Sequence, residues 1–590
     1  MKFGPEMLDG AVGFRIWAPK IKHVSLLIDG GLPLKMESVG EGWHELISPT
    51  ARAGTRYKFQ FDESGVQVPD PASRYQPLDV HGPSEVIDPN QHVWSNGGWA
   101  GRPWEECVLY EMHVGTFTQH GTFRDAIERL DWLFDLGVTA IEIMPVADFP
   151  GMRNWGYDGV LLYAPDSSYG RPEHFKALID AAHARGIAVL LDVVYNHFGP
   201  DGNYLPSYSP VFTERHKTPW GAAVNYDAEG SEVIREFIIQ NAVYWIQEFH
   251  LDGLRFDAVH AIKDDTTTHI LDEIARRIRR LPIVRPVHLL LENEENQASW
   301  LERNAEGDSI NYTAQWNDDV HHVLHCAASQ EGSGYYAAYL GDTEKLGKAL
   351  AEGFAFQGDL MSYRGSPRGE PSAHLPPTAF VSFIQNHDQV GNRAFGDRIT
   401  ISAPAAAVRA VASVYLLLPQ IPMIFMGEEF GADQPFPFFC DFEAELAKLV
   451  REGRRNEFAK FPEFRDHASR ERIPDPTAEQ TFISAKLDWA SAGQGAHAGW
   501  TGLYRELLAL RHRDIVPRLR GAQSGQYRVL GKGAVAIRWQ MGDGAQLNLT
   551  ANLHDQTLAR PIPLVGRRIW SSGVLEDKLG PWGVLWSIEA

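Results

Sequence analysis

The stretch Leu251-Asp-Gly-Leu-Arg-Phe-Asp-Ala-Val-His260 organises the interpretation of the whole chain. It follows residues 231–250, whose apolar side chains recur with helical spacing. After the glycine the side chains alternate, so that the leucine and the phenylalanine face one way while Arg255 and Asp257 face the other. In a strand that helices cover, the outer face packs apolar side chains. The arginine and the aspartate are therefore expected inside the sheet, where the strand ends.

A buried arginine beside an aspartate is costly unless the two serve each other or a ligand. The guanidinium of Arg255 would keep Asp257 ionised, which is the state that a nucleophile requires. An ion pair that only fixes the packing of the strand would have the same sequence. This stretch alone leaves both interpretations open.

The composition indicates a large globular protein with an acidic surface. A chain of 590 residues is too long for one core and predicts about three domains. Its 55 Lys and Arg against 76 Asp and Glu give a net charge of −21, which argues against a nucleic-acid partner, because phosphates need clustered cations. The 17 Trp, 19 Tyr and 29 Phe suit a protein that stacks sugars, although an aromatic-rich core would have the same composition.

We expect a cytoplasmic protein without a membrane partner. The three cysteines, Cys107, Cys326 and Cys440, are far apart and form no metal-ligand spacing, which suits a reducing compartment. The first residues carry acids and no apolar run, unlike a signal peptide. The longest apolar stretch, residues 411–426, is interrupted by two prolines and a glutamine and predicts a helix that leads into a buried strand. The oligomeric state stays open.

The two ends of the chain predict small β domains. Residues 1–97 contain short alternating strands separated by turns such as Asp29-Gly-Gly, which predicts an N-terminal β-sandwich of carbohydrate-binding-like type. Residues 95–103 are rich in glycine and predict a linker. Short strands return after the helix expected over residues 503–512, so residues 518–590 are expected to form a C-terminal β domain.

Residues 98–517 alternate between strand and helix patterns. Thr122 is expected to cap a helix that stops before Gly137, and Pro172 to begin another that ends at Gly186. The expected strands are residues 108–113, 138–144, 187–194, 253–256, 288–291, 310–315, 379–384 and 422–426. Eight such units predict an α/β protein with a (β/α)₈ TIM barrel and long loop insertions. A doubly wound sheet would carry a glycine-rich phosphate turn after its first strand, which this sequence lacks.

The ends of four expected strands carry the residues that could perform chemistry, because active sites of such barrels lie at this edge. These ends contain Asp192 to His197, Arg255 with Asp257, Glu292, and Asn386 to Asp388. Each residue alone has an ordinary explanation as a helix cap or a satisfied polar group. Packing does not readily explain all four strand ends together.

Two carboxyl groups on either side of a bond are the equipment for glycoside hydrolysis. Asp257, beside Arg255, fits the ionised nucleophile. Glu292 fits the proton donor because it follows an apolar strand, where burial raises the pKa of a carboxyl group. Glu294 and Glu295 follow closely, so the choice among the three depends on the register of the strand.

The chain resembles the α-amylase superfamily, glycoside hydrolase family 13, over essentially its whole length. The resemblance rests on Asp192-Val-Val-Tyr-Asn-His197, Gly253-Leu-Arg-Phe-Asp257, Glu292 and Asn386-His-Asp388. It implies that Asp257 is the nucleophile, Glu292 the general acid/base and Asp388 the stabiliser of the transition state. It also implies cleavage of an α-glucosidic bond with retention. The residues that it assigns to the attacked sugar are His197, Arg255, His387 and, as a stacking platform, Tyr157.

Other segments are similar to the trehalose-releasing members of this superfamily, which hydrolyse the α-1,4 bond next to a terminal α,α-trehalose of maltooligosyl trehalose. These segments include Arg153-Asn-Trp-Gly-Tyr-Asp-Gly-Val, Thr218-Pro-Trp-Gly-Ala-Ala-Val-Asn-Tyr and Ala314-Gln-Trp-Asn-Asp-Asp-Val-His-His. The analogy places Trp316, Asn317 and Asp318 near the trehalose unit; the alternative for these three residues is an ordinary packed loop. We also expect His260 to bind the substrate. The motif Glu292-Asn-Glu-Glu-Asn departs from the pattern that the resemblance implies, in which the glutamate is followed by serine or aspartate and then by aspartate. The roles of Glu294 and Glu295 therefore stay open.

Two other functions stay open on the same scaffold. A glycogen-branching or debranching enzyme would act on α-1,6 bonds, and a glucan-binding protein on an inactive amylase fold would have lost a catalytic acid. Many amylases hold calcium with an asparagine at the position of Asn196. Calcium takes six to eight oxygen ligands, and the loop after the third strand contains no dense group of acids. We therefore expect no required metal and no cofactor.

Overall fold

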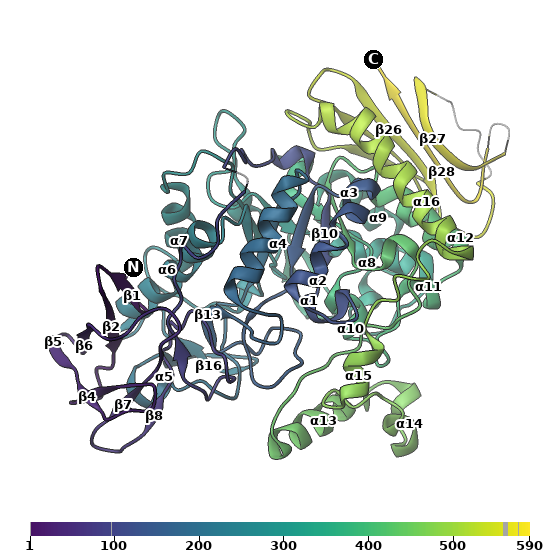
Figure 1. The fold of residues 1–590 in the computed structure, drawn as a ribbon. Coiled ribbons are helices and arrows are strands. Elements are labelled where there is room, and N and C mark those ends of the chain that lie inside the picture. The colour runs from purple at the N-terminus through teal and green to yellow at the C-terminus, as the bar shows by residue number, and fades with distance from the viewer. Residues whose placement is uncertain (1, 96, 559–564, 576–577) are drawn as a thin grey trace.

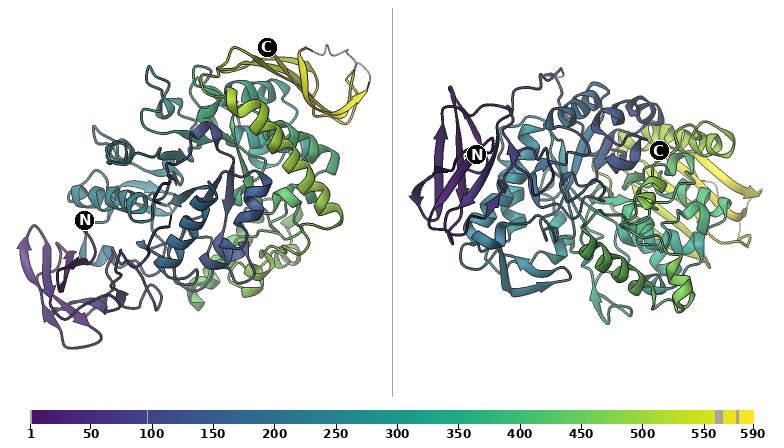
Figure 2. Two further views of the ribbon diagram at one scale, coloured as in Figure 1. Left: turned by 45° about the horizontal axis from the view of Figure 1, so that its top comes forward. Right: turned by 60° about the horizontal axis from the view of Figure 1, so that its bottom comes forward.

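The computed structural model describes residues 2–95, 97–558, 565–575 and 578–590 and shows a barrel flanked by two β structures (Figure 1). Sheets formed from the first part of the chain lie at one end of the molecule, and the C-terminal sheet lies at the other end (Figure 2). Residue 96 of the predicted linker lies outside the described residues, as do residues 559–564 and 576–577 of the predicted C-terminal domain. The domain boundaries at 97 and 517 stay predictions.

Eight parallel strands close into a barrel, as the alternating pattern predicts. In order around the barrel they are β10 (Leu109–Met112), β11 (Ala140–Ile143), β14 (Ala188–Val193), β17 (Gly253–Phe256), β18 (His288–Leu291), β19 (Ala314–Trp316), β22 (Phe380–Ser382) and β23 (Ile421–Phe425), which pairs with β10. Every residue of these strands is buried, because helices cover the outside and side chains fill the inside. The sixth strand was predicted over residues 310–315 but begins at Ala314, since Ile310, which completed the apolar pattern, is exposed.

Helices surround the barrel in the order that the sequence predicts. The longer ones are α3 (Leu130–Leu136), α4 (Pro172–Ala184), α6 (Ser231–Glu248), α7 (Ile270–Arg279), α8 (Asp318–Ser329), α9 (Thr343–Glu352), α12 (Ala405–Tyr415) and α16 (Gly495–Leu510). Thr122 caps α2 (Phe123–Ile127) by accepting the amide N–H of Asp125, as expected, but the helix breaks before α3. Gly137 ends α3 with a φ of 103°, in the left-handed region that glycine enters without a steric penalty.

The N-terminal strands form two sheets that face each other. One sheet has the order β1 (Glu6–Leu8), β2 (Ala11–Trp17), β6 (Trp43–Ser48), β5 (Glu37–Gly40); the other has β4 (Leu34–Lys35), β3 (Val24–Ile28), β7 (Arg56–Phe61), β8 (Gln67–Val68), with β9 (Ser84–Glu85) also paired to β7. Phe14 and Ile16 of β2 are buried, as are Tyr57 and Phe59 of β7. The rings of Phe14 and Tyr57 meet across the sheets with centroids 4.7 Å apart.

The C-terminal strands form one five-stranded antiparallel sheet. Its order is β24 (Gln526–Gly531), β25 (Ala534–Gln540), β26 (Gln546–Asn552), β28 (Lys578–Glu589), β27 (Arg567–Leu575). Trp586 stacks on Trp539 and donates its indole N–H to the carbonyl of Ser413 in α12, 2.9 Å away. This bond joins the sheet to the barrel. The apolar stretch after residue 411 is the end of α12 followed by β23, and none of the described helices is long and apolar enough to cross a membrane.

The register of three neighbouring strands sets up the functional edge. Asp192 of β14 lies opposite Arg255 of β17, and Phe256 lies opposite Leu291 of β18. Asp257 and Glu292, which come next in each strand, therefore emerge side by side. Gly253 allows this close pairing, because a Cβ at this position would come within 2.2 Å of the carbonyl oxygen of His288.

Candidate active site

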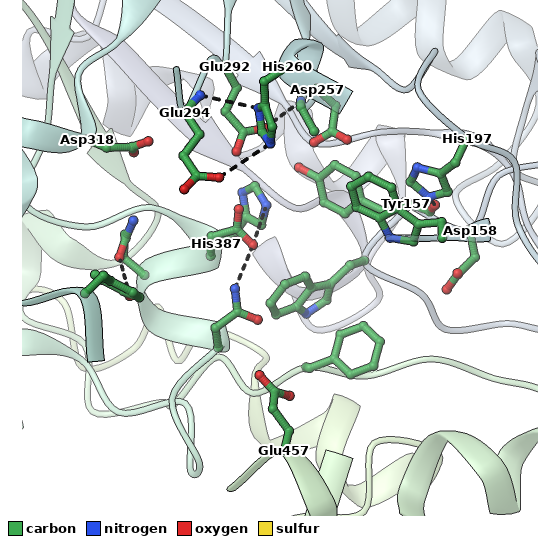
Figure 3. A pocket seen from close by; sticks show the side chains of 18 of the residues that line it. Tyr157, Asp158, His197, Asp257, His260, Glu292, Glu294, Asp318, His387 and Glu457 are labelled. Carbon is green, nitrogen blue, oxygen red and sulfur yellow. Dashed lines mark hydrogen bonds and ion pairs between the residues drawn. The ribbon is translucent and has the colours of Figure 1, made fainter. Parts of the chain in front are cut away.

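A cavity of about 920 Å³ opens at the C-terminal ends of the barrel strands. Its wall contains Asp257, Glu292 and Asp388, which the sequence analysis had identified from three different strand ends. Figure 3 shows Asp257 and Glu292 near each other, with His387 below them and Tyr157 and His197 to one side. Aromatic side chains line the wall as well: Trp155, Tyr157, Phe198, Trp220, Tyr335, Tyr363 and Phe438.

The guanidinium of Arg255, which lies behind this wall, bonds to three carboxyl groups. Arg255 is fully buried and donates from Nη1 to Oδ1 of Asp257 at 2.9 Å and from Nη2 to Oε2 of Glu292 at 2.8 Å. Nη1 also donates to Asp192. The sequence predicts a pair between this arginine and the neighbouring aspartate alone. In the structure it fixes both candidate catalytic acids against each other.

Asp192 bonds to Arg255 and also accepts a hydrogen bond from Tyr157. The hydroxyl of Tyr157 donates to Oδ2 of Asp192 at 2.6 Å. Burial raises the pKa of Asp192 to about 7, even though the positive charge of Arg255 acts in the opposite direction. The hydrogen bonds from Arg255 and Tyr157 also oppose the effect of burial and favour the ionised form of Asp192.

Asp257 is held on both sides. Arg255 occupies Oδ1, and the side-chain amide of Asn196 donates to Oδ2 at 2.7 Å and to the backbone carbonyl at 2.8 Å. Hydrogen bonds of this kind to an ionised carboxylate fix its orientation. The carboxylate reaches the cavity with one restricted geometry, as a nucleophile requires.

Glu292 is oriented by a strained turn that follows β17. Its Oε2 accepts the backbone N–H of Ala258 at 2.8 Å in addition to the bond from Arg255. Ala258 has a φ of 40°, a conformation that side-chain-bearing residues adopt at a cost and that concentrates at functional sites. Because both of these bonds go to Oε2, Oε1 is left to face the cavity.

Asp388 lies beside His387, which is bonded to Glu111 in the barrel interior. Asn392 donates to Oδ1 of Asp388 at 3.1 Å, and Nε2 of His387 lies 3.5 Å from the same atom. On its other side His387 contacts the buried Glu111 of β10 through its ring and through its backbone N–H. Burial disfavours the charged ring, but Asp388 and Glu111 outweigh it and raise the pKa of His387 to about 9. The ring is therefore a cation at neutral pH.

The platform at the base of the cavity is built from Tyr157 and two histidines. The Tyr157 ring stacks on His387 with centroids 5.0 Å apart. His197 bonds to the carbonyl of Tyr157 through Nε2 at 2.9 Å and to Asn196 through Nδ1. Its ring stacks on Trp220 with centroids 4.6 Å apart. His197 thus lines the cavity, as predicted, and also holds both the platform and the residue that orients Asp257.

More polar groups line the cavity around Glu292 (Figure 3). Asp318, Glu294, His260 and Arg368 line this end of the cavity. Burial, together with the nearby charge of Glu292, raises the pKa of Asp318 to about 8. At neutral pH Asp318 can therefore donate a hydrogen bond. Nδ1 of His260 accepts the backbone N–H of Glu294 at 3.3 Å, whereas Glu295 turns away to pair with Arg364.

Three of the predicted binding residues lie behind the cavity wall in the structure. Trp316 is 1% exposed and lies behind the wall, with its ring 4.1 Å from the guanidinium carbon of Arg255. Asn317 is completely buried; it caps α8 and donates to the carbonyl of Gly353 at 2.7 Å. Arg255 also lies behind the wall. Of the Trp316–Asp318 run, Asp318 reaches the cavity, because the helix that starts there turns it outward.

Three residues that orient the acids were not predicted from the sequence. Asn196 was considered only as a calcium ligand, yet its amide holds Asp257. Glu111, one residue before the end of β10, holds His387, and Asn392 donates to Asp388 from one turn further along the chain. An acidic residue within a buried strand was the available signal for Glu111. Asn392 lies four residues after Asp388, a spacing that brings side chains together on a helix.

A different group of side chains could hold a metal ion. Among the described residues, ligand atoms of His216, Asp227 and Asp265 lie within 4.8 Å of one another. Arg215 lies 3.5 Å from a carboxylate oxygen of Asp227 and 3.9 Å from one of Asp265, so a cation already stands at this group. The expectation that no metal is required stays a prediction.

Comparison with known proteins gives consistent matches. A family model described as the alpha amylase catalytic domain matches residues 88–214, and a domain of unknown function (DUF3459) matches residues 522–586.

The malto-oligosyltrehalose trehalohydrolase of Deinococcus radiodurans is 43% identical over 520 residues, 87% of this chain and 84% of that protein. The enzyme of the same name from Saccharolobus solfataricus is 40% identical over 542 residues, 91% and 92% of the two chains. A crystal structure of a putative alpha amylase from Salmonella typhimurium has 45% identity and a TM-score of 0.95, covering 100% of this chain and 99% of that one.

The raised pKa of His387 predicts a pH dependence of stability. Its charged form stabilises the fold fully below the unfolded pKa of 6.5, and this contribution is lost as the pH rises through about 9. Thermal unfolding of the wild type should therefore shift downward between pH 6.5 and 9.5 by more than that of His387→Gln, which lacks the titrating group. Equal shifts in the two proteins would contradict the assignment.

Proposed function

The chain belongs to the malto-oligosyltrehalose trehalohydrolase family of the α-amylase superfamily, and we propose that Asp257, Glu292 and Asp388 carry out its reaction as a retaining glycoside hydrolase. The substrate proposed is maltooligosyl trehalose, cut at the α-1,4 bond next to the trehalose unit. The observation that carries the assignment is that Arg255 binds the first two acids at once, in the wall of one cavity.

In the first step Asp257 attacks the anomeric carbon of the donor sugar, while Glu292 gives its proton to the glycosidic oxygen. The bond to trehalose breaks and a covalent glycosyl ester forms on Asp257. In the second step Glu292, now ionised, takes a proton from water, whose oxygen attacks the same carbon and frees Asp257. Two inversions leave the new reducing end in the α configuration.

The geometry around Arg255 supports this mechanism. Retaining enzymes hold their two carboxyl groups about 5 Å apart, whereas inverting enzymes need room for a water between them. Here each acid accepts a bond of less than 3 Å from one end of the same guanidinium, which keeps them close. The bonds from Arg255 and Asn196 also fix the orientation of the Asp257 carboxylate.

The attacked sugar would lie over Tyr157, between His197 and His387. Asp388 is a third exposed in its side chain and faces this position, where it can bind sugar hydroxyls. The charged ring of His387 beside it adds a donor for the same hydroxyls. Hydrogen bonds that strengthen as the ring flattens in the transition state contribute to the rate.

Recognition of trehalose is proposed at the end formed by His260, Glu294, Asp318 and Arg368. A site that separates trehalose from maltose needs positioned hydrogen bonds, because the two disaccharides have similar apolar surfaces. Arg368 is fixed by Asp319 and by the hydroxyl of Tyr339, with distances of 2.7 and 2.6 Å. A donor held this rigidly suits the recognition of one acceptor geometry.

The experiment that tests the function compares the products from maltotriosyl trehalose and maltopentaose. Rapid release of trehalose from the first, with slow cleavage of the second, is expected. Equal cleavage of both would make the protein a general α-1,4 glucanase. Activity only on branched glucans would instead assign it to the branching or debranching enzymes.

The acid assignments predict that Asp257→Asn and Glu292→Gln each lower kcat/KM on maltotriosyl trehalose by several orders of magnitude with little change in thermal stability. Fluoride leaves without protonation, so maltosyl fluoride should restore the first step in Glu292→Gln but not in Asp257→Asn.

Asp131→Asn is the matched control, because Asp131 is an exposed acid that pairs with Arg185 on the surface. It should behave as the wild type. Near-normal turnover of the natural substrate by Asp257→Asn would refute the nucleophile assignment.

A further inference from the structure

The chain between β23 and α16 leaves the barrel and forms a helical arm (Figure 1). The arm contains α13 (Ala444–Phe458), α14 (His467–Glu471) and α15 (Glu479–Ser484). Only the last residue of α13, Phe458, is buried. A helix of this length that packs so little of its surface needs another reason to lie where it does.

One face of α13 forms part of the cavity wall. Val450, Arg454 and Glu457 line the cavity, and their spacing of four and three residues places them on the same side of the helix. Glu457 lies apart from Asp257 and Glu292, on the far side of His387 (Figure 3). The cavity therefore continues from the catalytic acids to α13.

This end of the cavity would receive the donor part of the substrate. Glu292 protonates the leaving oxygen, so the trehalose unit lies on the side of Glu292, with Asp318 and Arg368. Glu457 lies on the far side of His387 from Glu292, so it would face the donor part of the substrate (Figure 3). The arm is bound there: Nη2 of Arg454 donates to the carbonyls of Gly391 and Arg393, on either side of Asn392, at 2.8 and 3.2 Å.

The groups at this end have the chemistry of a sugar-binding site. The side chain of Arg454 is 10% exposed, and its guanidinium carbon lies 5.9 Å from the centre of the Phe438 ring, which also lines the cavity. Arg454 donates to Glu457 at 3.1 Å, which orients a carboxylate whose side chain is 49% exposed. An aromatic face beside a positioned carboxylate matches the apolar face and the hydroxyl edge of a glucosyl unit.

We propose that Glu457, oriented by Arg454 and set beside Phe438, binds hydroxyl groups of a donor glucosyl unit remote from the cleaved bond, and that α13 thereby gives the enzyme a preference for long maltooligosyl chains. The inference rests on the proposed function. Contacts this far from the reacting atoms are made equally in the ground state and the transition state, so their loss appears in KM.

The test measures kcat/KM for glucosyl trehalose and for maltotetraosyl trehalose. The first substrate has one donor unit and ends near Asp388, whereas the second extends toward α13. For Glu457→Gln the ratio of long-donor to short-donor kcat/KM should fall about tenfold, the usual effect of weakening a hydrogen bond to a charged group. The change should lie in KM.

Glu452→Gln is the matched control, since it makes the same change on another face of α13, where Glu452 pairs with Lys448. Its ratio should equal that of the wild type. An unchanged ratio in Glu457→Gln, or an equal loss with both substrates, would overturn the inference while leaving the proposed function intact. Failure of the wild type to release trehalose from either substrate would overturn the proposed function itself.

Discussion

The buried guanidinium of Arg255 is the group on which the rest of the site depends. A buried cation is destabilising unless its donors are satisfied and its charge is neutralised. Asp192, Asp257 and Glu292 supply that compensation from three different strands. The planar fork of arginine can hold two carboxylates in fixed directions, which the compact ammonium of lysine cannot. The same contacts that make Arg255 tolerable in the interior also set the relative positions of the two catalytic acids.

The barrel makes this arrangement possible through its register. Strands of three to six residues leave little room for variation, and parallel pairing brings the end of each strand to the same edge. Asp192, Asp257 and Glu292 lie on or directly after three strands that are separate in the sequence, yet all three bond to Arg255. Gly253 sustains the close approach of β17 and β18 that this arrangement needs. Beyond this edge, loops and the α13 arm give the cavity its two different ends.

Much of this organisation could be predicted from the sequence, because periodic patterns report burial. The barrel and seven of its strands were predicted within a few residues, and Asp257, Glu292 and Asp388 were placed together because active sites occupy the ends of barrel strands. Patterns do not show which polar side chain bonds to which. The role of Asn196 and the position of Asn317 behind the wall therefore required coordinates. The arm was not predicted for a related reason: α13 is polar overall and buries only its last residue, so its sequence does not mark it as part of a core.

The central claim is that Asp257 and Glu292, set close together by Arg255, act as nucleophile and acid/base in a double displacement. The most direct measurement follows the anomeric proton signals of the newly formed reducing end by NMR during the first minutes of hydrolysis, before mutarotation. The account predicts that the α-anomer appears first and the β-anomer grows in later. First appearance of the β-anomer would show inversion and would contradict the assignment of Asp257 as a covalent nucleophile.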